Sequence, residues 1–133
     1  MREGIGKKVK KGSLRLLISN IEAYNTYKSQ KDPLKYRFID HDMNRIWNTP
    51  FIEDSVEYKR REELKPILLQ SDIILDIHSV SKGDDVLGIA DKKSLSDAEK
   101  FMDVEKILVQ DIESSSMTSW CARQGKLAFG IEA

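Results

Sequence analysis

The sequence is poor in the residues that mark several classes of protein. Its 133 residues include one cysteine, Cys121, so no disulfide can form within the chain, and this usage is typical of a reducing compartment such as the cytoplasm. The neighbours Trp120 and Ala122 favour a packing role for this thiol over one as a nucleophile. No run approaches the roughly 20 apolar residues of a membrane span, and no apolar segment follows the basic start as in a secretory signal.

An excess of charge of either sign is also missing. Lys+Arg and Asp+Glu each number 22, so the formal net charge is zero. A balanced chain gives no bulk electrostatic reason to expect nucleic acid or an anionic membrane as a partner. The basic residues between Arg2 and Arg15 are interpreted as a solvated loop rather than a phosphate-binding arm.

Short strand-like and helix-like patterns alternate along the chain. Strands are expected at residues 13–18, 73–77, 86–90, 106–109 and 127–131, and helices at 54–70, 94–103 and 112–124. Residues 42–47 predict a short helical turn, and residues 20–35 a long loop. This alternation predicts one α/β domain, a layered α/β/α sandwich around a mixed, partly parallel sheet.

Three details of these elements are specific enough to test. Asp54 and Glu57 have the spacing of a capping box at the start of a helix. Pro66 predicts a kink or restart in that helix. The apolar run 73–77 is interpreted as a buried strand. In such sheets, sites gather at the carboxyl ends of strands, here after Ile18, at His78 and at Glu132.

His78 follows directly on the strand predicted at 73–77. A neutral imidazole at a strand end is a good zinc ligand. Asp76 faces the same side of the strand, where its carboxylate would orient the imidazole. A core histidine satisfied by one hydrogen bond fits the spacing equally well, since a single histidine does not make a metal site.

Residues 37–45 are crowded with groups that bind carboxylates: Arg37, Asp42, Asn44 and Arg45. Arginine forks bind carboxylates with two hydrogen bonds, and asparagine adds a donor and an acceptor. An internal salt bridge, with Asp40 or Asp42 neutralising the arginines, fits as well. His41, between these two aspartates, is expected to be exposed to solvent.

Two further charged residues lie near the end of the chain. Glu132 closes the last predicted strand, where a carboxylate can act as a general base on water, although an exposed polar residue fits there too. Arg123 ends the helix before that strand. It either complements the helix dipole or reaches the same pocket.

Three motifs in this order resemble those of the succinylglutamate desuccinylase/aspartoacylase family of zinc amidohydrolases, which is related to the zinc carboxypeptidases. They are RFIDHDMNR (37–45), DIH (76–78) and GIE (130–132). The resemblance spans nearly all of the chain. It implies a zinc-carboxypeptidase-like fold and hydrolysis of the amide bond of an N-acyl amino acid.

The resemblance also implies a role for each matching residue. His78 becomes a zinc ligand, and Arg37 polarises the scissile carbonyl and stabilises the oxyanion. Glu132 takes a proton from zinc-bound water and returns it to the leaving amine. The substrate carboxylate is held by Asn44, Arg45 and Arg123, and the site is supported by Asp42 and Asp76.

One departure from the family pattern is important. The family supplies two more zinc ligands from a His-x-x-Glu motif after its first strand, and nothing before Lys11 matches it. Because a catalytic zinc takes three protein ligands, we expect weak zinc binding and little hydrolysis by this chain alone. The family also continues past its catalytic Glu. We therefore expect a partial catalytic domain with an uncovered sheet edge that favours self-association.

Two alternatives remain open. In the first, the chain is a non-catalytic module that binds acidic metabolites through Arg37, Asn44 and Arg45 without metal. In the second, it is a plain α/β domain in which the motifs match by chance. The two differ in geometry, since a chance match predicts that Arg37, Arg45, His78 and Glu132 lie far apart.

Overall fold

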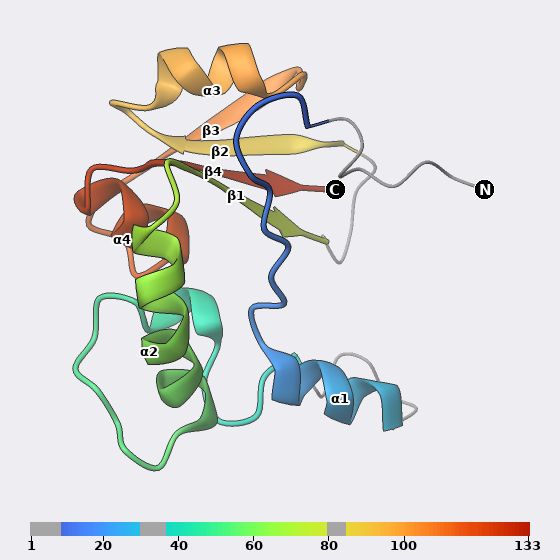
Figure 1. Ribbon diagram of the computed structural model, residues 1–133, viewed down its shortest axis with the longest axis vertical. Helices are drawn as coiled ribbons and strands as arrows, with labels where there is room; N and C mark the ends of the chain where they lie inside the picture. Colours follow the sequence, from blue (N-terminus) through green and yellow to red (C-terminus); the bar gives the residue numbers. More distant parts are fainter. Residues whose placement is uncertain (1–8, 30–36, 80–84) are drawn as a thin grey trace.

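The computed structural model describes residues 9–29, 37–79 and 85–133, and a four-stranded mixed sheet forms their centre (Figure 1). Its strands are β1 (Ile73–His78), β2 (Leu87–Asp91), β3 (Lys106–Gln110) and β4 (Leu127–Glu132). They lie in the order β1-β4-β2-β3. The pairs β1–β4 and β2–β3 are parallel, and β2–β4 is antiparallel. The predicted mixed α/β sheet is confirmed.

The described helices are α1 (Ile21–Ser29), the 3-10 turn η3 (Met43–Arg45), α2 (Val56–Leu69), α3 (Leu95–Phe101) and α4 (Met117–Arg123). Helices cover both faces of the sheet, whereas α1 lies away from the strands (Figure 1). On one face, α3 packs over a core of Ala90, Ala98, Met102 and Phe129. On the other face, α2 and α4 enclose a core that includes Trp47, Leu64, Leu68, Ile74, Met117, Cys121 and Ala128. No described helix is long and apolar enough to span a membrane.

Strand β1 is only half buried, so the prediction of a fully buried strand is wrong. Ile74 lies in the core, whereas Ile73, Leu75 and Ile77 are 46%, 49% and 71% exposed. The reason is the strand order, because β1 is an edge strand whose outer face lies beyond the cover of α3.

The N-terminal segment differs most from the sequence expectation. Residues 13–18 are exposed and form no strand, since no described strand pairs with them. Helix α1 replaces the first part of the predicted loop, because the Asn20 side-chain oxygen accepts a hydrogen bond from the Ala23 amide at 3.1 Å and caps the helix. Residues 30–36 lie outside the described part of the chain.

The helix boundaries also shift. Ser55, not Asp54, caps α2 by accepting a hydrogen bond from the Tyr58 amide, and α2 runs to Leu69 through Pro66 as one element. Pro66 is exposed, so the hydrogen bond that its missing N–H would have made lies on the solvent side of the helix. The expected helix 112–124 begins only at Met117, since Ser116 caps α4 there.

Candidate functional site

His78 and Asp76 form the centre of the site at the carboxyl end of β1. The Asp76 Oδ2 atom lies 2.7 Å from His78 Nε2, with Asp76 largely buried and the imidazole about one-third exposed. The hydrogen bond to Asp76 raises the pKa of His78, burial opposes this, and the charges of Asp76 and Glu132 raise it further. The carboxylate therefore fixes the orientation of the imidazole, as the sequence predicts.

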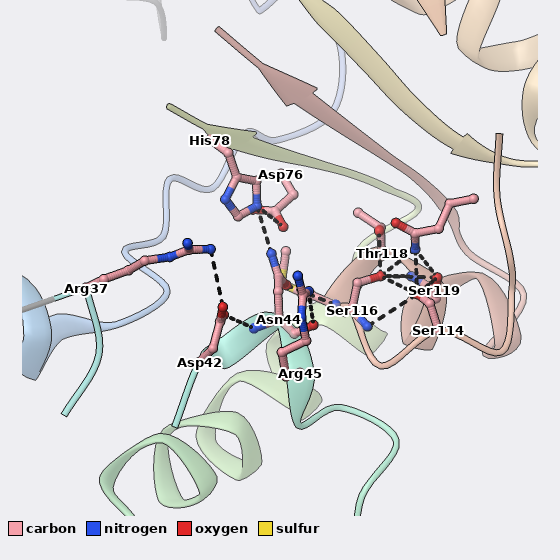
Figure 2. A network of polar contacts seen from close by, with 12 residues as sticks. Arg37, Asp42, Asn44, Arg45, Asp76, His78, Ser114, Ser116, Thr118 and Ser119 are labelled. Atoms are coloured by element: carbon pink, nitrogen blue, oxygen red, sulfur yellow. Dashed lines mark hydrogen bonds and ion pairs between the residues drawn. The ribbon is translucent and has the colours of Figure 1, made fainter. Parts of the chain in front are cut away.

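The same imidazole nitrogen also faces the side chain of Asn44, with Nδ2 3.0 Å from His78 Nε2 (Figure 2). One nitrogen cannot donate to Asp76 and accept from Asn44 at once. The shorter distance and the charged acceptor favour a proton on Nε2 that is donated to Asp76. In the neutral imidazole this tautomer leaves the lone pair on Nδ1, the atom that then remains for a ligand or metal.

Asn44 is held in place from two sides. Its Oδ1 atom accepts a hydrogen bond from the Met117 amide at 3.2 Å, which fixes the orientation of the amide group against the start of α4. Its backbone N–H donates to Asp42 Oδ1 at 2.9 Å, and Asp42 thereby caps η3. The short η3 turn thus points the Asn44 side chain at His78, joining two segments 34 residues apart.

The two arginines of the 37–45 segment are available at the surface. Arg37 Nη2 lies 3.2 Å from Asp42 Oδ2, with the Arg37 side chain 69% exposed. Arg37 is close enough to His78 for its charge to oppose protonation of the imidazole. Arg45 is exposed and donates to the carbonyl oxygen of Asn44 at 3.0 Å. Arg37 therefore forms the internal salt bridge that was one of the two interpretations of this segment. Both arginines keep further N–H donors toward solvent.

Glu132 lies beside His78 in the sheet. The two residues are register partners in the parallel pair β1–β4, so their side chains project from the same face. The Ala133 amide donates to the His78 carbonyl at 3.0 Å and holds the two strand ends together. Arg37, Asn44, Asp76 and Glu132 thus all lie near His78, whereas the described contacts of Arg45 are with Asn44.

Arg123 has a different environment. Its Nη1 atom donates to the carbonyl oxygens of Ile112 and Ser114, so it braces the turn before α4. Its Nη2 atom is buried and has no hydrogen-bond partner among the described residues. The described contacts of Arg123 do not include His78.

Two other sequence expectations are settled by burial. His41 is half-buried, with Nδ1 3.0 Å from Ser55 Oγ and its ring against the edge of Tyr58, so the expectation of a solvent-exposed histidine is wrong. Cys121 is fully buried in the core below β1 and β4, and burial raises its pKa to about 12. The thiol is therefore a packing group, as its neighbours predict.

Sequence reasoning missed two buried charges on α2. Glu57 is 0% exposed and Arg61 is 3% exposed. They lie at helical spacing with Leu64 and Leu68, and all four face the protein interior. The spacing was visible in the sequence, but charged residues on a helix are ordinarily solvated, so the pattern alone did not distinguish them from a surface stripe.

The described residues do not fit a complete zinc site. They contain no group of three or more histidine, cysteine, aspartate or glutamate side chains arranged to hold a metal ion. His78 offers Nδ1 as one ligand atom, and Asp76 is engaged with the other ring nitrogen rather than free to bind a metal. A catalytic zinc takes three protein ligands. The described part of the chain supplies at most a portion of such a site.

No protein-family model matches the chain, and a comparison with curated proteins gives no match either. The resemblance to zinc amidohydrolases therefore rests on the three sequence motifs alone.

Proposed function

We propose that this chain carries the substrate-binding part of a zinc-dependent amidohydrolase that cleaves the amide bond of an N-acyl amino acid. The supporting observation is the contact of Asn44 with His78, which brings the RFIDHDMNR and DIH motifs together at one sheet edge. Motifs that match by chance have no reason to meet there. The proposal includes a cytoplasmic location, in accord with the single, unpaired Cys121.

The proposed substrate is held by its carboxylate. Arg45 and the Asn44 amide provide donors beside the imidazole, and a guanidinium can hold a carboxylate with two parallel hydrogen bonds. Arg37 reaches toward the same space from the other side of Asp42, where its charge would stabilise an oxyanion formed from the scissile carbonyl. Asp42 competes for Arg37 and keeps it oriented until the substrate arrives.

Glu132 is the proposed proton carrier. It lies in register with His78 on the neighbouring strand, where a carboxylate can accept a proton from attacking water and return it to the leaving amine. The remaining zinc ligands must come from outside the described residues, and the chain alone is expected to hydrolyse little.

A second function is favoured by the incomplete metal site. The chain would then bind acidic metabolites through Arg37, Asn44 and Arg45 without metal or hydrolysis. Both functions require the same carboxylate-binding group of Arg37, Asn44 and Arg45, which we call the carboxylate grip. They differ in whether zinc strengthens binding and in whether the amide bond is cleaved.

Calorimetric titration with N-acetyl-L-glutamate, with zinc or with a chelator, tests both. We expect binding that Arg45→Ala abolishes and that Lys100→Ala, on α3 at the opposite face of the sheet, leaves unchanged. Zinc-dependent binding lost in His78→Ala supports the amidohydrolase, and equal binding in chelator supports the metal-free module. Absence of binding in both conditions, or unchanged binding in Arg45→Ala, contradicts the carboxylate grip.

A further inference from the structure

Glu57 is a fully buried carboxylate with an unusual set of partners. Its Oε1 atom accepts hydrogen bonds from Ile39 N at 2.7 Å and from Asn20 Nδ2 at 2.8 Å. Its Oε2 atom accepts from Asp40 N at 3.0 Å and His41 N at 3.1 Å. Three consecutive backbone N–H groups therefore end on one side chain, immediately before the η3 turn that carries Asn44.

These hydrogen bonds also explain how a charge is tolerated at this position. Burial by itself raises the pKa of Glu57, but the hydrogen bonds from Ile39, Asn20, Asp40 and His41 outweigh burial, and the pKa is lowered. The carboxylate also lies in the first turn of α2, where the helix dipole favours negative charge. Glu57 is thus ionised, and both of its carboxylate oxygens accept hydrogen bonds. These hydrogen bonds fix the backbone conformation of residues 39–41.

The segment is anchored to α2 in both directions. Asp40 Oδ2 accepts a hydrogen bond from the Val56 amide at 2.8 Å, so the loop also caps the helix that holds it. One turn further along α2, the buried Arg61 donates to the carbonyl oxygen of Thr49 at 2.8 Å and to that of Ile46. The two buried charges of α2 hold the chain on both sides of η3.

From this arrangement we infer that Glu57 is a positioning residue for the carboxylate grip, acting through the backbone of residues 39–41 on Arg37, Asp42 and Asn44. The inference rests on the proposed function, since it assigns Glu57 a part in the same site. Glu57 itself contacts neither His78 nor the proposed position of the ligand in the described contacts. Its effect is to fix where the donors of the grip point.

The isosteric substitution Glu57→Gln tests this directly. Glutamine has one acceptor oxygen where glutamate has two, and each oxygen here receives two donors, so either orientation of the amide leaves two donors facing an NH2 group. The matched control is Glu63→Gln on the same helix, whose side chain is 64% exposed and pairs only with Arg60 at the surface. A milder second variant, Asp40→Asn, weakens the reciprocal anchor at an exposed residue.

Two readouts are needed, calorimetric titration with N-acetyl-L-glutamate and 1H–15N spectra of the free protein. We expect Glu57→Gln to weaken binding by about 10- to 100-fold, because misplaced donors lose contact with the ligand. Asp40→Asn should weaken binding less, and Glu63→Gln should leave it unchanged. In the free protein, the Asn44 side-chain amide and the His78 ring signals should shift in Glu57→Gln and stay in place in Glu63→Gln.

The outcomes separate the two levels of the proposal. A folded Glu57→Gln variant that binds like the wild type overturns the positioning role while the proposed function stands. If the wild type itself fails to bind, the proposed function fails, and the spectra of the free proteins then test the positioning role. Shifts in Glu57→Gln that are confined to residues 39–41, with the Asn44 and His78 signals unmoved, overturn the positioning role. If Glu57→Gln does not fold, the test uses Asp40→Asn instead. Unchanged binding and unchanged Asn44 and His78 signals in Asp40→Asn overturn the positioning role. Weaker binding together with shifted signals supports it.

Discussion

Two polar networks lie next to each other in this protein, and they differ in how completely their groups are satisfied. Around Glu57, four donors end on one buried carboxylate. Around His78, one imidazole nitrogen is shared by two partners and Arg37 is largely exposed. A network without spare donors or acceptors can only hold structure, whereas one with spare donors at the surface can exchange a partner for a ligand.

Each network contains one of the two histidines of the chain. His41 belongs to the Glu57 network through its backbone N–H, and its ring is held by Ser55 and Tyr58. His78 belongs to the open network at the ends of β1 and β4. The pair of histidines therefore reports separately on the closed and the open region.

The largest expected effect is on stability and lies in the closed network. Glu57→Ala leaves three partly buried backbone N–H groups without their acceptor, and we expect the free energy of unfolding to fall by about 2–4 kcal/mol. Glu63→Ala, which breaks one exposed ion pair, should change it by less than about 1 kcal/mol. Urea denaturation followed by circular dichroism measures both. Equal effects of the two substitutions would contradict the distinction between the networks.

A smaller effect is expected in the open network, and it depends on pH. The pKa of His78 is raised above its ordinary value of 6.5, chiefly by Asp76, so the folded state holds this proton more tightly. The resulting stabilisation is complete below the unfolded pKa and is lost as the pH rises through the higher folded pKa. For a partly exposed pair we expect less than about 1 kcal/mol. Asp76→Asn should reduce this slope in urea titrations between mildly acidic and mildly alkaline pH, because only the smaller effect of Glu132 then remains, and an unchanged slope contradicts the pairing.

The smallest expected stability effect concerns Arg45. Its side chain is exposed and bonded to a neighbouring carbonyl, so Arg45→Ala should change the free energy of unfolding by less than about 0.5 kcal/mol. The same substitution should abolish binding of N-acetyl-L-glutamate. Binding loss without stability loss is the signature of the open network, and a large stability loss in Arg45→Ala would place this arginine in the closed one.

The sequence predicted the strands better than the surroundings of the site. The apolar runs of β1 and β4 stand out against their polar flanks, so the ends at His78 and Glu132 were located correctly. Helix α1 was missed because its main signal is one cap, Asn20, before a weakly apolar stretch. The exposure of one face of β1 depends on strand order, which local pattern does not determine.

The site itself was predicted in part. The motifs identified Asn44 and His78, but not that their side chains meet at 3.0 Å. The buried roles of Glu57 and Arg61 were not predicted, because their partners are backbone N–H and carbonyl groups of distant loops. A sequence does not show which side chain such a backbone group will meet. Arg123 was assigned to the substrate, yet its guanidinium bonds to the carbonyls of Ile112 and Ser114, contacts that arise from the turn before α4.

The most direct test of the central claim follows the ring signals of the two histidines by NMR during titration with N-acetyl-L-glutamate. Because His78 lies near Arg37 and Asn44, its ring signals should move with ligand concentration and saturate. The ring of His41, enclosed by Ser55 and Tyr58, should stay in place. A saturable shift of His78 alone is the predicted result. Movement of His41 without His78, or no movement of either ring, would contradict a carboxylate-binding site at His78.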